Sequence, residues 1–563
     1  MTIQTLLESR LRDALGGEPA QVSATADARF GDYQTNVAML QAKVRRANPR
    51  QVAAGIVERL DVADICEAPE IAGAGFLNFR LKPEFLARQT HALLGDPRLG
   101  VPEAAEKRKI VLDFSSPNVA KPMHVGHIRS TILGDTLARL ARFLGHEVVT
   151  DNHVGDWGTQ FGKVIYGWKH FRDDAALAAT PIHELVRLYK HANALSESDP
   201  AILSACREEL VKLQAGDLEN LSIWKQTVAL SWKEFEAMYG LLGIHFDEHL
   251  GESFYNDALA PLVERLLACG IAEVSEGAVC VFFRDNPALA DKPCLIRKTD
   301  GGFLYATTDL ATLEYRTRHW QADAIWYVVG APQALHFAQI FAVAARMGIQ
   351  GDLRHIPFGS ILGEDRKLMK TRSGENVGLR EVLEEAQQRA LRIVQEKNPQ
   401  MPADEQGAIA RIIGIGAVKY AELSQFRMSD YVFAWDKLLS FQGNTAPYLQ
   451  NAYVRIRSIF RKLDGEFAVP AALALEADAE VALAKKLLQF GETVPQTLDD
   501  FRPNLLANYL YELANIFHGF YEACPVLKSE GETRASRLAL CELTARVLRD
   551  GLGLLGIQVP ERM

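Results

Sequence analysis

Cysteine is scarce in this sequence, and its positions suggest neither a metal centre nor a disulfide framework. Seven cysteines are spread over 563 residues, and no two stand at the spacing of two to four residues that structural zinc sites use. An odd number of scattered cysteines is typical of reduced, mostly buried thiols. We therefore expect that the protein itself binds no metal.

Long apolar runs are also missing. Nowhere do eighteen apolar residues follow one another, which argues against a membrane-spanning helix. The opening residues, MTIQTLLESRLRDALGG, carry Glu8 and Asp13 within an amphipathic pattern, which argues against a signal peptide. These absences predict a cytoplasmic protein with no membrane partner.

An excess of positive charge is missing as well. The chain has 62 lysines and arginines against 71 aspartates and glutamates, a formal net charge of −9. This balance argues against a general nucleic-acid binder, because neutralising phosphates requires clustered lysine and arginine. An acidic total does not exclude a local basic face, and the C-terminal part of the chain is the candidate for one.

The sequence does have the composition of an ordinary globular protein, with 48% apolar and 24% charged residues. A chain of this length exceeds one hydrophobic core, so two to four domains are expected. A loop rich in glycine, proline and charge, residues 95–108, predicts the first boundary. Beyond Gly374 the periodicity of apolar residues is almost entirely helical, which predicts a second domain boundary.

Between these boundaries, predicted strands and helices alternate. KIVLDF (109–114) and HEVVTDN (146–152) read as strands, and the helix between them ends where Gly145 provides a C-cap. Such a strand–helix–strand unit belongs to a parallel sheet, which binds ligands at the carboxyl ends of its strands. After a largely helical insertion, strands are predicted again at CLIRK (294–298), FLYAT (303–307), AIWYVVG (324–330) and RHIPFGSIL (354–362).

Two histidines, His124 and His127, lie at the start of that first helix, on either side of Gly126. Imidazoles at a helix start can donate to a phosphate and to the leaving group of a bound nucleotide, where the helix dipole already favours anions. Gly126 leaves room for a flat base against the backbone. Taken alone, the pattern fits two surface histidines near a turn equally well.

A second stretch strengthens the nucleotide interpretation. Residues 363–378, GEDRKLMKTRSGENVG, place Lys367, Lys370 and Arg372 in a loop flanked by glycines. Lysines on such a loop suit a pyrophosphate leaving group, because negative charge develops on its oxygens in the transition state. A solvated charged loop is the alternative for this stretch alone, but its combination with the histidine pair argues against that reading.

The two stretches resemble the HIGH and KMSK signatures of class I aminoacyl-tRNA synthetases, and specifically of the arginyl-tRNA synthetase family. Other stretches resemble that family in the same order over practically the whole chain: FGDYQTN (30–36), NHVGDWGTQFG (152–162), GGFLYATTD (301–309), GAVKYAELS (416–424), QGNTAPYLQNAYVRIRSI (442–459) and the closing ERM. The resemblance implies ATP-dependent ligation of L-arginine to its tRNA through an arginyl-adenylate, with release of pyrophosphate and AMP. In this family, activation usually waits for tRNA.

The resemblance implies that ATP binds at residues of the two signatures: Pro117, His124, Gly126, His127, Lys367 and Lys370. Magnesium would be carried by ATP, and catalysis would rest on positioning and charge stabilisation without a protein nucleophile. The KLMK stretch lacks the serine of KMSK, so the sequence leaves open which lysine contacts the phosphates. Lys121, in the loop before the histidines, is a candidate to share that role, and a solvent-facing lysine is the alternative.

The resemblance also implies an arginine pocket, formed by Asp113, Asn118, His153, Tyr305, Asp309 and Gln333. A guanidinium fork requires carboxylate and carbonyl oxygens in its plane. Tyr305 and Asp309, four residues apart, can share one face of the helix that begins there. For Asp309, a helix-capping carboxylate is the alternative.

By the same resemblance the chain has four parts: an α+β N-terminal domain that contacts tRNA (1–105), a Rossmann-type catalytic domain (106–375, with a helical insertion at about 163–290), a helical stem (376–440) and an all-α anticodon-binding domain (441–563). In the last part, Thr445 is predicted to cap a helix that carries Arg455 and Lys462 beside aromatic residues. Such a stripe suits the unstacked bases of an anticodon loop, although an amphipathic surface helix gives the same pattern. We expect both residues to bind tRNA and the chain to be a monomer.

Three other functions fit parts of the pattern. A cysteine-specific class I synthetase would need a zinc site in its amino-acid pocket, which these scattered cysteines do not build. A small nucleotidyltransferase of the same superfamily would lack the long helical tail. A catalytically inactive tRNA-binding relative would have no need of its signature residues, which are all present.

Overall fold

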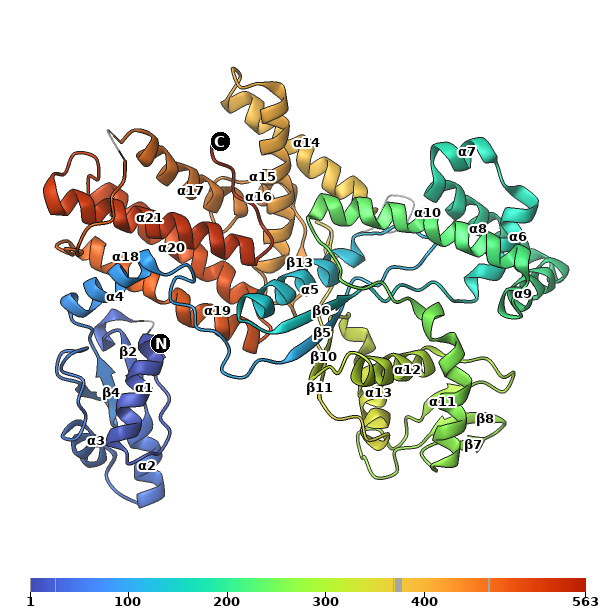
Figure 1. Cartoon of the computed structure of the whole chain (residues 1–563), viewed down its shortest axis with the longest axis horizontal. Coiled ribbons are helices and arrows are strands. Elements are labelled where there is room, and N and C mark those ends of the chain that lie inside the picture. Colours follow the sequence, from blue (N-terminus) through green and yellow to red (C-terminus); the bar gives the residue numbers. More distant parts are fainter. Residues whose placement is uncertain (1, 26, 368, 370–376, 464–465) are drawn as a thin grey trace. The chain divides into compact units, whose positions relative to one another are not determined.

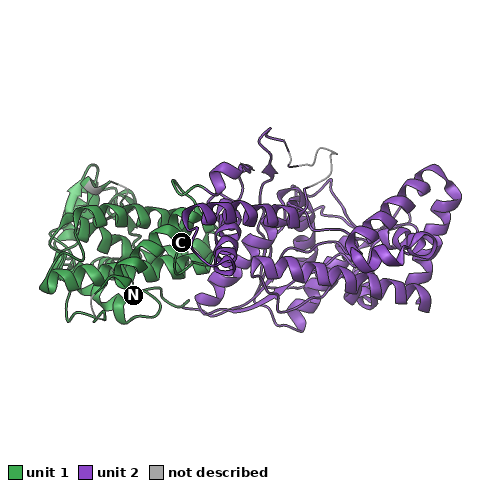
Figure 2. Cartoon of the chain, turned by 90° about the horizontal axis from the view of Figure 1, so that it is seen from above, with its two compact units in different colours: residues 1–104, 440–563 green, residues 105–439 purple. Residues whose placement is uncertain are grey.

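The computed structural model describes residues 2–25, 27–367, 369, 377–463 and 466–563. The chain forms two compact units, shown in different colours in Figure 2. One unit joins Met1–Ala104 with Ser440–Met563, and the other comprises Ala105–Leu439. The first unit is therefore built from both ends of the chain.

The first unit combines a small antiparallel sheet with helices. The sheet has the order β1-β2-β4-β3 and consists of β1 (Ser23–Ala24), β2 (Tyr33–Thr35), β3 (Glu70–Ala72) and β4 (Phe76–Phe79). The helices of its N-terminal segment are α1 (Ile3–Ala14), η1 (Ala28–Phe30), α2 (Val37–Arg45), α3 (Pro49–Val57) and α4 (Pro83–Gly95). The C-terminal segment contributes α17 (Ala446–Arg461), α18 (Asp478–Leu488), α19 (Phe490–Asp499), α20 (Pro503–Ala523) and α21 (Gly531–Leu554).

Polar contacts join the two segments of this unit. The Tyr33 hydroxyl donates to Glu492 at 2.9 Å, and Lys485 pairs with Asp32 at 2.6 Å.

The predicted cap of α17 is confirmed, because the Thr445 side chain accepts a hydrogen bond from the backbone N–H of Tyr448.

The second unit is organised around a four-stranded parallel sheet, labelled in the middle of Figure 1. Its order is β11-β10-β5-β6, formed by β5 (Lys109–Asp113), β6 (Glu147–Asp151), β10 (Ala324–Tyr327) and β11 (Asp352–His355). The helix α5 (Gly126–Phe143) connects β5 to β6. The predicted strand–helix–strand unit and the α/β fold class are therefore confirmed.

Helices and short strands fill the rest of this unit. Between β6 and β10 follow α6 (Gln160–Phe171), α7 (Asp174–Ala179), α8 (Pro181–Ser198), α9 (Pro200–Gln214), α10 (Leu218–Leu242), η2 (Glu252–Tyr255), α11 (Asn256–Ala268), β7 (Glu273–Ser275), β8 (Ala278–Val281), β9 (Cys294–Arg297) and α12 (Tyr305–Arg318). After β10 come η3 (Ala331–Gln333), α13 (Ala334–Arg346), β12 (Ile361–Leu362), α14 (Leu379–Lys397), α15 (Ala403–Leu423), β13 (Tyr431–Val432) and α16 (Trp435–Leu438). The strands β7, β8 and β9 form an antiparallel sheet, and β12 pairs with β13 in parallel.

The local sequence explains the start of the parallel sheet. Ile110, Val111 and Leu112 of β5 are fully buried, as expected for a strand covered on both faces. The helix α5 ends beside Gly145, whose φ of +91° matches the predicted left-handed C-cap. Gly134 of α5 makes room for Phe114, the residue that follows β5.

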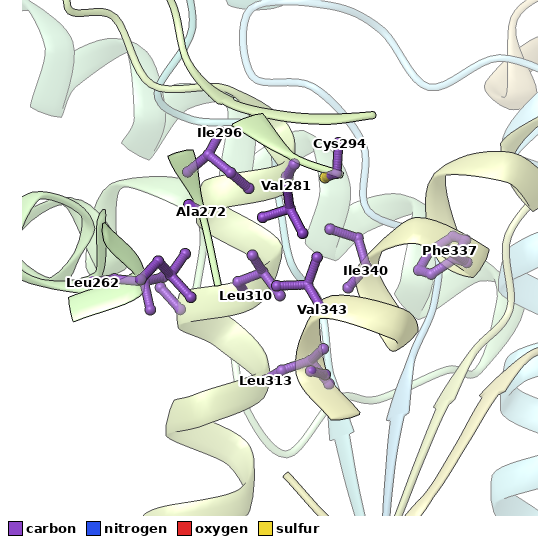
Figure 3. Packing of buried hydrophobic residues seen from close by; sticks show 14 of the residues in the cluster. Leu262, Ala272, Val281, Cys294, Ile296, Leu310, Leu313, Phe337, Ile340 and Val343 are labelled. Carbon is purple, nitrogen blue, oxygen red and sulfur yellow. The ribbon is translucent and has the colours of Figure 1, made fainter. Parts of the chain in front are cut away.

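An apolar cluster fixes α12 and α13, which carry residues of the site (Figure 3). Leu310 and Leu313 of α12 and Ile340 of α13 are fully buried there. They share the cluster with Val281 of β8 and Ile296 of β9. The small antiparallel sheet therefore acts as the support against which both helices pack.

Two strand predictions were wrong in extent. In FLYAT only Phe303 pairs, in an antiparallel bridge with Arg297, and α12 begins at Tyr305. In RHIPFGSIL the strand β11 ends at His355, and residues 361–362 join β13 instead of the parallel sheet. Short apolar runs do not distinguish a long strand from two separate elements.

Replacing Gly134 by alanine tests the packing of α5 on β5. A methyl group there would lie 2.1 Å from Cγ of Phe114, so we expect Gly134→Ala to reduce the free energy of unfolding by about 1–3 kcal/mol. The matched control is Gly407→Ala in α15, where no atom lies within 4 Å of the new methyl group. That variant should be neutral or gain up to about 1 kcal/mol of helix propensity. Thermal denaturation of the two variants compares them, and equal melting temperatures would contradict the packing described.

Candidate functional site

The loop between β5 and α5 lies at the carboxyl end of β5 in a strained conformation. Ser115, Ser116 and Ala120 have φ values of +71°, +46° and +61°, a region that non-glycine residues seldom adopt. Buried hydrogen bonds hold the loop in place: the hydroxyls of Ser115 and Tyr239 lie 2.8 Å apart, and Asn152 donates to the Tyr239 hydroxyl at 2.9 Å. Such a loop has one well-determined arrangement.

Asn118 in this loop packs against a glycine of the neighbouring segment. The N–H of Val119 donates to the carbonyl of Gly155 at 3.1 Å, and the N–H of Gly155 donates to the carbonyl of Pro117 at 3.1 Å. A methyl group on Gly155 would lie 2.4 Å from Oδ1 of Asn118. Gly155 therefore leaves space for the Asn118 side chain.

The two histidines pack against each other at the start of α5. Their ring centroids are 4.1 Å apart. The backbone N–H of His124 donates to Nδ1 of His127 at 3.0 Å, and that of Gly126 donates to Nδ1 of His124 at 3.1 Å. The hydrogen bond from Gly126 places the proton of the neutral His124 ring on Nε2, whereas Nδ1 of His127 lies between the N–H and, at 3.2 Å, the carbonyl of His124. His124 can therefore act as a neutral Nε2–H donor.

Burial keeps the histidines neutral. It lowers the pKa of His127 to about 3, with a further contribution from His124. It also lowers the pKa of His124, assisted by the positive charge of Lys121. A methyl group on Gly126 would lie 2.8 Å from the His124 ring, so glycine is required there by the ring itself.

The loop of residues 363–378, the basic loop, is anchored at its described ends. The upstream end is anchored at β12, and the downstream end close to the histidines. Downstream, the N–H of Val125 donates to the carbonyl of Val377 at 2.8 Å, and the N–H of Leu379 donates to the carbonyl of Met123 at 2.9 Å. Upstream, the N–H of Met369 donates to the carbonyl of Ile361 at 3.3 Å. Met369 is therefore paired with β12, and Val377 and Leu379 are paired with the residues beside the histidines.

The lysines of the site have different surroundings. Lys367 is exposed, and Lys370 lies outside the described residues, as does Arg372. The Lys121 ammonium lies 5.7 Å from the centre of the Tyr189 ring in α8 and close enough to His124 to affect its pKa. The structure therefore brings Lys121 to the histidines.

The predicted pocket residues occupy several elements. His336 of α13 contacts Asp309 at 2.5 Å, whereas Tyr305 at the start of α12 is 67% exposed. Nδ1 of His153 lies 2.9 Å from the carbonyl of Leu250. Gln333 ends η3 and is exposed, one turn before His336. The sequence reasoning missed His336, although this histidine follows the predicted Gln333 by only three residues.

Glu252 is a second residue that sequence reasoning missed. Burial raises its pKa to about 7, and the charges of His153, Asp156 and Asp309 act on it. Burial raises the pKa of Tyr305, and the charge of Glu252 adds to this shift. Glu252 therefore lies among three predicted pocket residues, although its sequence surroundings, GESFYN, give no signal of such a role.

Asp113 has a charged partner within the chain. Arg316 of α12 is completely buried and contacts Asp113 at 2.6 Å and Asp151 at 2.7 Å. The Ser116 hydroxyl donates to the other oxygen of Asp113 at 3.1 Å. Asp113 therefore helps to hold the end of β5 in place, and its direct contact with a substrate guanidinium stays a prediction.

In the first unit, Arg455 and the C-cap residue Lys462 are exposed on α17. The charge of Arg455 acts on Tyr448 and His518. The Tyr448 hydroxyl donates to Asn515 at 2.6 Å and lies 2.7 Å from Nδ1 of His518. A cation beside aromatic and amide groups is thus present on this face of α17 and α20.

Within residues that the structure describes, no three His, Cys, Asp or Glu side chains converge as metal ligands would. In the same part of the chain, no helix has both the length and the apolar character needed to cross a bilayer.

Models of three domain families match the chain. They are the class I tRNA synthetase (R) catalytic domain at residues 89–435, the DALR anticodon-binding domain at 449–563 and the arginyl-tRNA synthetase N-terminal domain at 1–81. An arginine–tRNA ligase of Cellvibrio japonicus is 46% identical, with all of both chains covered. The chain belongs to the arginyl-tRNA synthetase family. A ligase of the same name from Nostoc punctiforme is 47% identical over 100% of this chain and 98% of its own.

Solved structures of arginyl-tRNA synthetases agree with this membership. The enzyme of Thermus thermophilus has a TM-score of 0.86 at 27% identity, covering all of both chains. That of Plasmodium falciparum has a TM-score of 0.85 at 28% identity, covering 100% of this chain and 98% of its own. The resemblance inferred from the sequence is therefore confirmed.

The low pKa of His127 predicts an effect of pH on folding stability. In the unfolded chain a histidine takes up a proton near pH 6.5, whereas the buried ring does so only near pH 3. Between these values the unfolded state binds more protons, so folding stability falls as the pH falls. We expect His127→Asn to lose less melting temperature than the wild type between pH 7 and pH 5. An identical decrease in both proteins would contradict a neutral His127.

Proposed function

We propose that the chain ligates L-arginine to its tRNA in two steps. A carboxylate oxygen of arginine attacks the α-phosphorus of ATP, and the bond from that phosphorus to the oxygen bridging to the β-phosphate breaks, releasing pyrophosphate. A hydroxyl of the terminal ribose of the tRNA then attacks the arginyl carbonyl carbon, losing its proton as AMP departs. Membership in the family supports arginine charging in protein synthesis as the overall reaction.

The histidine pair is the observation that carries the first step. Neutral imidazoles at the start of α5 can donate to the phosphates without the cost of desolvating a positive charge. Fixed donors placed where negative charge develops contribute more than mobile ones, because they need no reorganisation during the reaction. We assign His124 and His127, with Pro117 and Gly126 beside them, to binding ATP.

The lysines complete the phosphate site in this proposal. Lys367 and Lys370 belong to the KLMK stretch of the sequence, and the charge of Lys121 acts on His124. We assign all three to the departing pyrophosphate. Magnesium, which we expect to arrive on the phosphates of ATP, supplies further charge neutralisation there.

The arginine pocket in this proposal contains two carboxylates. Asp309 and Glu252 interact electrostatically, and a guanidinium between them would neutralise both. Asn118, His153, Tyr305 and Gln333 supply further polar groups around this point. His336 orients Asp309 through their 2.5 Å contact.

The helical face around Arg455 is our proposed contact for the anticodon loop, together with Lys462. Guanidinium and aromatic planes bind unstacked bases there. We further propose that the N-terminal domain contacts tRNA and that the enzyme acts as a monomer in the cytoplasm.

Exchange of labelled pyrophosphate into ATP tests this assignment. We expect exchange that depends on arginine and occurs only when tRNA is present, with each of the other amino acids as a control. Exchange driven by a different amino acid would overturn the substrate. No exchange under any condition would support a catalytically inactive tRNA-binding protein instead.

Replacing Glu252 by glutamine tests the pocket. Losing a charged partner of the guanidinium costs about 1.5–3 kcal/mol, or roughly 10- to 100-fold in KM for arginine. In the wild type this KM should fall from pH 6 to pH 8, because the carboxyl with a pKa of about 7 becomes ionised over that range. Glu252→Gln should remove most of this pH dependence.

The control for the pocket is Glu264→Gln, which removes an exposed carboxylate that pairs with Arg297. Its KM for arginine should equal that of the wild type at every pH. An unchanged KM in Glu252→Gln would exclude Glu252 from the pocket.

A further inference from the structure

Helix α10 contacts the strained loop between β5 and α5 through two buried polar residues that the proposed chemistry does not use. The helix packs against α6, α8 and α9 and extends from them toward α5 (Figure 1). Ser231 of α10 is fully buried, and Tyr239 is 4% exposed. They are eight positions apart and therefore share one face of the helix. Because buried polar groups are seldom left without hydrogen-bonding partners, their partners indicate what this face does.

Tyr239 holds the first two strained residues of the loop. Its hydroxyl lies 2.8 Å from that of Ser115 and accepts a hydrogen bond from Nδ2 of Asn152 at 2.9 Å. The other end of this amide, Oδ1 of Asn152, accepts from the backbone N–H of Ser116 at 3.1 Å. Tyr239 therefore acts on Ser115 directly and on Ser116 through Asn152.

Ser231 holds the third strained residue. Its hydroxyl accepts a hydrogen bond from the backbone N–H of Ala120 at 3.1 Å and donates to the carbonyl of Thr227 at 2.9 Å, one turn earlier in α10. All three left-handed residues of the loop, 115, 116 and 120, are thus tied to this one helix. Such residues keep their backbone angles only where the surrounding structure enforces them.

Asn118 lies between these anchors. Its side chain is exposed, and its neighbours Pro117 and Val119 form backbone hydrogen bonds with Gly155. The place of the Asn118 amide is therefore set by the conformation of the loop. If either end of the loop relaxed to ordinary backbone angles, this amide would move.

The histidine pair depends less on these anchors, because it belongs to the first turn of α5. The N–H of His127 donates to the carbonyl of His124 at 2.8 Å, and that of Ile128 donates to the carbonyl of Val125 at 3.1 Å. These bonds are local to the start of the helix. A change in the loop should therefore affect arginine more than ATP.

We propose that Ser231 and Tyr239 are positioning residues that hold Asn118 in place for arginine, and so set KM for this substrate. The proposal rests on the proposed function, because it takes Asn118 as part of the arginine pocket. Both residues act through the backbone of the loop, without touching the substrate. Losing a well-placed hydrogen bond to a charged substrate costs about tenfold in binding.

Tyr239→Phe tests the first anchor, because it removes the hydroxyl and keeps the ring. We expect KM for arginine in tRNA-dependent pyrophosphate exchange to rise about tenfold, with KM for ATP changed less than about threefold. The melting temperature should fall by a few degrees, since Asn152 loses a buried partner. An unchanged KM for arginine, or an equal rise in both KM values, would overturn the proposal.

Tyr509→Phe is the matched control for this variant. Tyr509 of α20 is also 4% exposed, and its hydroxyl donates to the carbonyl of Lys486 at 2.7 Å. The control therefore loses a buried hydroxyl bond of the same kind away from the loop. We expect a similar fall in melting temperature with both KM values unchanged. An equal rise in KM for arginine in the control would assign the effect to general destabilisation and overturn the proposal.

Ser231→Ala tests the second anchor and provides the measurement if Tyr239→Phe does not fold. KM for arginine should again rise, by about three- to tenfold, with KM for ATP unchanged. Its control is Ser536→Ala in α21, because Ser536 is 1% exposed and its hydroxyl accepts from the backbone N–H of Ala474 at 2.9 Å. The control should leave both KM values unchanged. Equal KM values for arginine in the two serine variants would overturn the role of Ser231.

A double variant shows whether Tyr239 acts through Asn118. Asn118→Ala alone should raise KM for arginine about tenfold. Adding Tyr239→Phe should then raise it by less than about threefold more, because residues that act as one unit are not additive. The fall in melting temperature caused by Tyr239→Phe should persist. A full further tenfold rise, or no effect of Asn118→Ala, would overturn the proposal.

The wild type measured in the same assay separates this proposal from the proposed function. A wild type without arginine-dependent exchange would overturn the assigned reaction. An active wild type, together with a folded Tyr239→Phe variant of unchanged KM for arginine, would overturn only the positioning role of α10.

Discussion

The arrangement of the proposed pocket depends on one buried arginine, Arg316, between two carboxylates. Asp113 and Asp151 are the last residues of the neighbouring strands β5 and β6. Burying either carboxylate without a positively charged partner would cost several kcal/mol. Arg316 provides that partner at 2.6 and 2.7 Å. Because Arg316 belongs to the helix that begins at Tyr305 and carries Asp309, the same ion pairs fix the pocket residues relative to the strand ends.

The loop after β5 is also strained, and hydrogen bonds hold it in this conformation. Each left-handed non-glycine residue costs on the order of 1–3 kcal/mol, and three occur between Ser115 and Ala120. Hydrogen bonds to Tyr239 and the bridge to Gly155 offset this strain. The result is that Asn118 and the histidines are presented in one arrangement before any substrate binds, which is the condition for efficient electrostatic catalysis.

Local sequence patterns predicted the parallel unit, the cap at Thr445 and the left-handed Gly145, because each depends on residues within one or two turns. The residues that organise the site were not predictable in this way. Arg316 and its partner Asp113 lie 203 positions apart along the chain. Glu252 has no local signal, because its significance arises from His153 and Asp309 on other elements.

Two carboxylates in the proposed arginine pocket would explain how the site can be stable before substrate binds and still select a cation. Burial and the charge of Asp309 favour the protonated form of Glu252, with a pKa of about 7, so the empty pocket does not hold two full negative charges. A guanidinium reverses this balance, because its positive charge favours ionised Glu252 and its fork satisfies both carboxylates. A neutral analogue such as citrulline cannot do so. The pocket can therefore discriminate at binding, where unpaired buried polar groups can impose factors of about 10⁴ to 10⁵.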